Sequence, residues 1–160
     1  SFGDIYVDRR LSKADQKRVL RAAIALYRKH PQVEAVFTAE QIERIPVPTT
    51  PPETWSLIQR ARASYYRGRS GDFVLILKKD ITPIADTSHY VATHGSAWDY
   101  DRRVPIIFWR PGVKGTTIEH SADTVDIMPT LASMIALPLS PGSVDGHCLS
   151  DVAGASCGER

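Results

Sequence analysis

The spacing of apolar residues predicts helices that alternate with strands. Four apolar residues recur with the period of one helical face: Leu20, Ala23, Ile24 and Tyr27. Ser12, followed three positions later by Asp15, is typical of a helix N-cap. Pro31 ends this helix, because the residue before a proline resists the helical region. Further helices are predicted over residues 39–44, 53–66 and about 123–137.

Short apolar runs predict four strands. They cover residues 5–7, 33–37, 73–77 and 104–109. The run Phe73–Leu77 is uninterrupted, which is typical of a strand buried on both faces. Since helices and strands alternate along the chain, the class is α/β, or α+β with mixed strand order.

A long polar loop connects the last two predicted strands, over residues 78–103. It contains His94, between Thr93 and Gly95. Loops of this length inside a domain are usually functional, and loops on rigid scaffolds carry much of protein chemistry. His94 is therefore a candidate metal ligand or acid/base group.

Composition bounds the remaining possibilities. The chain has 160 residues, 42% of them hydrophobic, which suits one folded domain. The net charge of +2 is too small to indicate a nucleic-acid partner or a membrane surface. No apolar run approaches the roughly 20 residues that span a bilayer. Ser1 is neither an initiator methionine nor the start of a signal-peptide pattern, so we expect a processed product or part of a longer chain.

Cys148 and Cys157 lie close together near the carboxyl terminus, among small residues. The spacing is not that of a metal-binding pair, and there is no second pair to complete such a site. We predict a disulfide between them, with two unpaired thiols as the alternative. A disulfide implies an oxidising compartment, periplasmic or extracellular.

The other histidines show weaker signals. His30, His120 and His147 are expected to be ordinary surface or structural residues. His89 shares the loop of His94 with three aspartates, at a spacing that matches no standard zinc signature: Asp86, Asp99 and Asp101. Ser88 beside His89, or Ser96 near His94, is not expected to be a nucleophile with its base, because sequence neighbours rarely have that geometry.

A second class of function is a polyanion-binding domain. Arginines alternate with tyrosines over residues 60–69, and three further basic residues line one face of the first helix: Lys13, Lys17 and Arg21. Such a pattern can bind single-stranded nucleic acid. The simpler interpretation is a solvated helix face with its tyrosines packed inward, since acidic residues nearly balance the basic ones.

Several ordered motifs resemble those of one family. They are Thr93-His94-Gly95-Ser96 with Asp99-Tyr100-Asp101, then Val104-Pro105-Ile106, Pro111-Gly112, Asp126-Ile127-Met128-Pro129-Thr130-Leu131 and Gly146-His147-Cys148-Leu149. In this order they resemble the C-terminal part of the alkaline phosphatase superfamily. The likeness is strongest to the bacterial phosphatases of the Sphingomonas type, with their nucleotide pyrophosphatase/phosphodiesterase-like core. It covers roughly residues 73–149; earlier residues match in the order of elements only.

The resemblance implies an α/β fold, the C-terminal part of a sandwich of helices around a mostly parallel sheet. It also implies a two-zinc phosphate-ester hydrolase that acts through a threonine or serine phospho-enzyme, with His94 as one zinc ligand. One zinc ion would stabilise the leaving oxygen and then supply hydroxide, while the other would activate the nucleophile. Asp99, Asp101 and the local backbone are all candidates for the group that holds the second ring nitrogen of His94.

The chain departs from the family because its other functional residues are absent. The family's nucleophile, its D-H-G motif and its remaining zinc ligands lie upstream of the matched region, and one histidine cannot hold a catalytic zinc ion, which needs about three protein ligands. We therefore expect residues 1–160 to be a C-terminal fragment of a single phosphatase domain, inactive alone. Its partners would be the rest of the parent polypeptide and a phosphate-ester substrate in the periplasm or outside the cell. Monoester or diester preference stays open.

Overall fold

A computed structural model of the protein describes residues 3–84, 86–112, 114–154 and 157. The chain forms two compact units, residues 1–104 and residues 105–160. The amino-terminal unit mixes helices with a small antiparallel sheet, and it contains His94. The carboxyl-terminal unit contains the two cysteines.

The sheet of the amino-terminal unit has three strands: β1 (Asp4–Ile5), β2 (Val33–Thr38) and β3 (Phe73–Leu77). Their order is β1-β3-β2, and both pairings are antiparallel. The predictions for residues 33–37 and 73–77 are confirmed, and the first strand is shorter than expected. β3 lies in the centre because its unbroken apolar run suits a strand with a neighbour on each edge and cover on each face.

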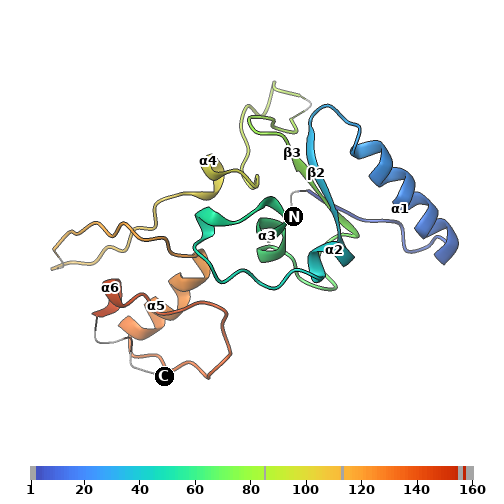
Figure 1. The fold of residues 1–160 in the computed structure, drawn as a ribbon. Helices are drawn as coiled ribbons and strands as arrows, with labels where there is room; N and C mark the ends of the chain where they lie inside the picture. Colours follow the sequence, from blue (N-terminus) through green and yellow to red (C-terminus); the bar gives the residue numbers. More distant parts are fainter. Residues whose placement is uncertain (1–2, 85, 113, 155–156, 158–160) are drawn as a thin grey trace. The chain divides into compact units, whose positions relative to one another are not determined.

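The helix α1 (Lys13–Tyr27) covers one face of this sheet (Figure 1). The Ser12 hydroxyl accepts a hydrogen bond from the Asp15 backbone N–H at 3.1 Å, so the predicted cap is confirmed. The apolar stripe of the helix packs on a cluster that includes Phe73, whose side chain is fully buried. The rings of Tyr27 and Phe73 lie 5.9 Å apart. The helical period in the sequence therefore fixes which face of α1 turns inward.

Three short helical segments follow β2: α2 (Ala39–Glu43), the 3-10 turn η1 (Pro52–Thr54) and α3 (Leu57–Ala63). Ile42 and Ala61 are buried, as is Ile76 of β3. The helix predicted over residues 53–66 is shorter because Ser56 and Gln59 form a capping box at its start. Ahead of this box, the prolines at 51 and 52 hold the chain in the separate 3-10 turn.

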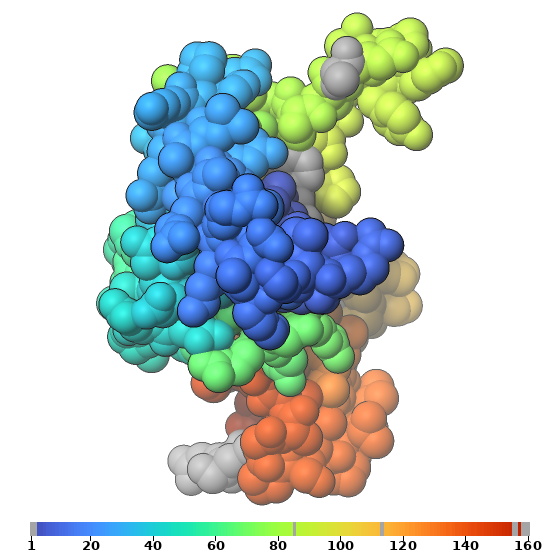
Figure 2. Space-filling model, turned by 90° about the vertical axis from the view of Figure 1, so that its right-hand side faces the viewer, coloured from blue at the N-terminus to red at the C-terminus, as the bar shows by residue number. Residues whose placement is uncertain are grey.

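Residues 78–84 and 86–98 form a loop that leads into α4 (Asp99–Arg102), so a short helix lies within the loop expected over residues 78–103. The side chains of Tyr90 and Val91 are 71% and 85% exposed. Figure 2 shows the yellow-green part of this loop standing out from the amino-terminal unit. The loop returns to the body of the unit at residues 96–98, which are half-buried.

The carboxyl-terminal unit contains η2 (Thr124–Asp126), α5 (Ile127–Met134) and α6 (Ser150–Ala153). The helix predicted over residues 123–137 thus begins as a 3-10 turn. Pro129 lies in the first turn of α5, where its missing N–H costs nothing. Within the described ranges, no helix is long and apolar enough to cross a membrane.

The strand predicted at residues 104–109 is not formed among the described residues, and this prediction is wrong for the structure. Ile107 and Trp109 are 81% and 82% exposed. A strand needs a neighbour to satisfy its backbone hydrogen-bonding groups, and no described segment pairs with this one. Its apolar sequence predicts burial, but that sequence alone cannot supply the partner.

Candidate functional site

His94 lies at the end of the exposed loop, next to a tight turn. Thr93, His94 and Gly95 are exposed, whereas Ser96 is half-buried. Gly95 has a φ of +99°, in the left-handed region that favours glycine. The glycine of the motif therefore turns the chain from the exposed histidine into the body of the unit, and it leaves the imidazole accessible to a ligand from outside.

Asp101 closes the turn that follows His94. Its carboxylate accepts a hydrogen bond from the Ser96 backbone N–H at 2.5 Å. This hydrogen bond is the main cause that holds the pKa of Asp101 below its ordinary value, and the nearby His94 charge acts in the same direction. The Ser96 hydroxyl in turn accepts a hydrogen bond from the Trp98 N–H at 3.3 Å. Asp101 and Ser96 thus fix the turn from within the motif.

Asp99, the other candidate partner of His94, faces two arginines instead. Its carboxylate lies 3.1 Å from the Arg60 guanidinium and 3.2 Å from that of Arg102. The sequence left Asp99, Asp101 and the backbone open as neighbours of the His94 ring. The structure pairs Asp99 with cations, whereas the His94 charge is the smallest of the causes that lower the pKa of Asp101.

A small cavity of about 140 Å³ lies behind the motif, inside the amino-terminal unit. Its lining comes from β3, α3 and the turn, and includes Val74, Ile76, Ser64, Ser96 and Trp98. The Trp98 indole N–H donates a hydrogen bond to the Leu77 carbonyl at 2.9 Å, which ties the turn to the end of β3. The sheet therefore positions the residues that follow His94.

Across the described ranges, no group of three histidine, cysteine, aspartate or glutamate side chains is arranged to hold a metal ion. His94 can supply one imidazole ligand, but these residues do not complete a zinc site by themselves. His89 lies exposed in the projecting part of the loop. The Ser88 N–H donates to Asp86, and neither Ser88 nor Ser96 is hydrogen-bonded to a histidine among the described residues. The structure thus supplies no nucleophile–base pair there.

Three of the four arginines in residues 60–69 are paired within the described part of the chain. The Arg62 guanidinium donates to the Ile45 carbonyl at 2.9 Å, and Arg67 forms an ion pair with Glu43 at 2.5 Å. Arg60 has only 11% of its side chain exposed and contacts Asp99. These cations are used to hold the fold together, which weighs against a polyanion-binding role.

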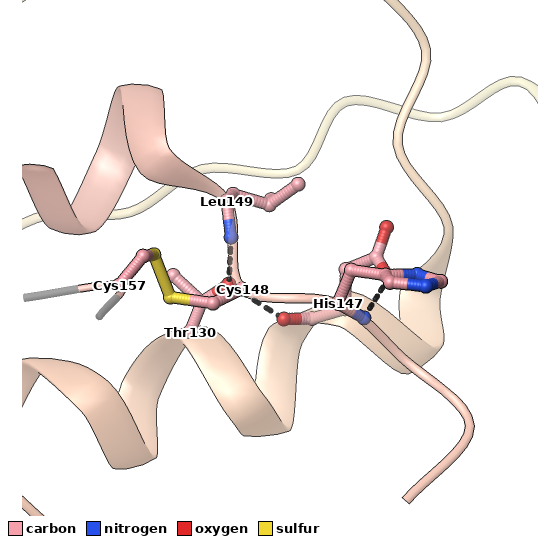
Figure 3. Close-up of a disulfide and its surroundings, with 6 residues drawn as sticks. Thr130, His147, Cys148, Leu149 and Cys157 are labelled. Carbon is pink, nitrogen blue, oxygen red and sulfur yellow. Dashed lines mark hydrogen bonds and ion pairs between the residues drawn. A yellow bond between two sulfur atoms is a disulfide. The ribbon is translucent and has the colours of Figure 1, made fainter. Parts of the chain in front are cut away.

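The carboxyl-terminal motifs have a structural role in the second unit (Figure 3). The buried Asp126 accepts the His147 backbone N–H at 2.8 Å, and the Thr130 hydroxyl accepts the Leu149 backbone N–H at 2.9 Å. A Cβ atom on Gly146 would lie 2.0 Å from the Val125 carbonyl oxygen. The aspartate, threonine and glycine of these motifs therefore dock the segment 146–149 onto η2 and α5.

Cys148 and Cys157 form a disulfide, as predicted (Figure 3). Their Cα atoms are 5.7 Å apart. The bond is consistent with an extracellular or periplasmic protein, since disulfides persist in oxidising compartments.

His120 makes an interaction that its sequence position did not predict. Its Nε2 atom lies 2.5 Å from the Asp151 carboxylate of α6, 31 residues away. This pairing raises the pKa of His120 above its ordinary value. No local sequence pattern predicts this interaction, because the two residues meet only through the packing of the second unit.

The sequence of this chain is similar to those of three alkaline phosphatases. The chain is 51% identical over 147 residues to the alkaline phosphatase PhoD of Zymomonas mobilis, covering 92% of this chain and 26% of that protein. It is 50% identical over 154 residues to the alkaline phosphatase PhoK of a Sphingomonas species, covering 95% and 28%. The alkaline phosphatase PafA of Elizabethkingia meningoseptica is 27% identical over 94% of this chain and 26% of its own length. No protein-family model matches the chain.

The resemblance found in the motifs is thereby confirmed: the sequence is similar to alkaline phosphatases over nearly its whole length. The chain spans about a quarter of the length of the curated relatives it matches. The identity extends across both units, including the residues before Phe73, for which the motifs gave only the order of elements.

Proposed function

We propose that this alkaline phosphatase-type chain is the C-terminal portion of a phosphate-ester hydrolase, in which His94 binds one of two zinc ions. One observation carries the proposal: half of the residues are identical to those of two alkaline phosphatases over more than 90% of the chain. The exposed position of His94, at the end of a turn fixed by Gly95 and Asp101, supports its role as a ligand.

The rest of the polypeptide would supply what the described residues lack. This comprises the remaining metal ligands and a threonine or serine nucleophile. It also includes the strands that complete a mostly parallel sheet between helices. When bound, zinc polarises the phosphate ester and lowers the pKa of a bound water molecule. His94 contributes a neutral ring nitrogen, and the turn limits the directions in which that nitrogen can point.

The test is a comparison of variants in the full-length polypeptide that contains this chain. We expect His94→Ala to lower kcat/KM toward a chromogenic phosphate ester by about 100-fold or more, since even groups that only orient a metal ligand are worth about 10- to 100-fold. It should also lower the zinc content of the purified protein. His89→Ala is the matched control from the same loop and should change neither quantity. Normal activity of His94→Ala would contradict the proposal, as would zinc-dependent turnover by the 160-residue chain alone.

A further inference from the structure

We propose that Arg60 is a positioning residue for the metal-binding motif, acting on His94 through the turn that follows it. The inference rests on the proposed role of His94, and it assigns a function to an arginine 37 residues before Ala97, which follows the motif. Among the described residues, the Arg60 side chain forms its hydrogen bonds and its ion pair with Trp55, Ala97 and Asp99. It holds the backbone on which His94 is placed.

Arg60 joins a rigid element to the motif. Its Nε atom donates to the Trp55 carbonyl at 2.9 Å, and one terminal nitrogen donates to the Ala97 carbonyl at 2.7 Å. The other terminal nitrogen lies 3.1 Å from the Asp99 carboxylate. The planar guanidinium therefore reaches three acceptors at once. A lysine ammonium, which is a point charge, cannot match that arrangement.

The burial of Arg60 makes these contacts strong and specific. Only 11% of its side chain is exposed, and it lines the cavity behind the motif. Because water reaches this side chain poorly, losing it would leave the Ala97 carbonyl without a donor and Asp99 with one cation fewer. Surface ion pairs elsewhere in the unit, such as that of Arg10 with Asp8, have no comparable burial.

The path from Arg60 to His94 is short and consists of fixed contacts. Ala97 lies between Ser96 and Trp98, which bind Asp101 and the Leu77 carbonyl. A displacement of the Ala97 carbonyl therefore moves the turn of Gly95, and the adjacent imidazole of His94 moves with it. Metal affinity is sensitive to such shifts because the ligand nitrogen must point at the ion.

Arg62 offers a matched control on the same helix. It is half-buried, and its guanidinium donates to a single carbonyl, that of Ile45, at 2.9 Å. Among the described residues, it forms no hydrogen bond with residues 93–101. Substitution of Arg62 therefore removes a similar side chain from α3 without touching the motif.

The experiment compares Arg60→Ala, Arg60→Lys and Arg62→Ala in the full-length polypeptide. In zinc-free protein, we expect Arg60→Ala to speed amide hydrogen exchange at residues 96–98 by about tenfold or more, as follows from the loss of charge-assisted hydrogen bonds. In loaded protein, it should lose zinc to a competing chelator more readily and lower kcat more than it raises KM. Arg60→Lys should lie between this variant and the native protein. Arg62→Ala should match the native protein in all three measurements.

The outcomes separate this inference from the proposed function. Unchanged hydrogen exchange at residues 96–98 in Arg60→Ala would overturn the inference. Native zinc retention and native kcat in Arg60→Ala, together with the loss of both in His94→Ala, would also overturn it. If Arg62→Ala had the same effect, Arg60 would only stabilise the helix in general, and the inference would also be overturned. If Arg60→Ala loses protection in β2 and β3, Arg60→Lys becomes the deciding variant, since it keeps the charge and most of the side chain. Failure of the proposed function shows instead in His94→Ala.

Discussion

At the scale of single residues, we expect the pairing of His120 with Asp151 to make the free energy of unfolding depend on pH. The hydrogen bond that the His120 ring donates to Asp151 is the largest cause that raises the pKa of His120 above its ordinary value of 6.5. The folded state therefore holds the proton more tightly than the unfolded state. The stabilisation is complete below the ordinary value, and it is lost as the pH rises through the raised pKa.

We expect an NMR titration of the His120 ring to show this raised pKa, and Asp151→Asn to return it toward the ordinary value. Because the pair is exposed, the effect on unfolding should be small and screened by salt. Asp145→Asn, which removes an exposed carboxylate from the same unit, is the control. A His120 titration that does not respond to Asp151→Asn would contradict the pairing.

The candidate site was only partly predictable from its residues. His94 was identified from its loop and its motif, and the turn at Gly95 follows from the freedom of glycine. Arg60 was considered only as a cation for a polyanion, because a periodic pattern shows which residues are basic and not which carbonyl they reach. Its partner Ala97 becomes a neighbour only after β3, α3 and the loop have packed.

At the scale of elements, local signals predicted the helices and strands whose partners are all present. The stripe of α1, the cap at Ser12 and the apolar run of β3 each act over a few residues, and each agrees with the structure. The antiparallel order β1-β3-β2 was not predicted, because strand order depends on contacts between distant segments. The segment 104–109 also shows that local sequence does not determine pairing. Its apolar pattern is typical of a strand, but it has no partner among the described residues.

We expect removal of the disulfide to lower the stability of the second unit alone. The bond closes a loop with a sequence separation of 9, worth about 2.5–3 kcal/mol in the chain-entropy model. We expect the double variant Cys148→Ser, Cys157→Ser to speed hydrogen exchange in α5 and α6 and to leave β2 and β3 unchanged. A reductant should give the native chain the same profile and should not alter the variant. Equal exchange in oxidised and reduced protein would contradict the prediction.

At the scale of the whole molecule, we expect the apolar segment 104–109 to differ between the 160-residue chain and the proposed longer polypeptide. In the described structure it has no strand partner, and Trp109 is 82% exposed. The alkaline phosphatases that the chain resembles are about three and a half times as long, with 26% and 28% of their length matched. In the longer polypeptide we expect this segment to join the proposed sheet.

Hydrogen exchange in the two forms tests this expectation. Amides of residues 106–109 should exchange rapidly in the 160-residue chain and become protected in the full-length polypeptide, because strand pairing removes them from water. The amides of β3, already paired on both edges, should be protected in both and serve as the internal reference. Rapid exchange at 106–109 in both forms would contradict the proposed sheet.

The docking of segment 146–149 on Asp126 and Thr130 has a consequence for how its disulfide forms. These hydrogen bonds need no oxidant, so the backbone on either side of Cys148 can be set in place while both thiols are reduced. Cys157 is then tethered to a fixed target by a short stretch of chain, which gives it an effective concentration in the millimolar range or above. Oxidation therefore joins two thiols, those of Cys148 and Cys157, that already lie close together. Pairing with a foreign thiol is correspondingly disfavoured.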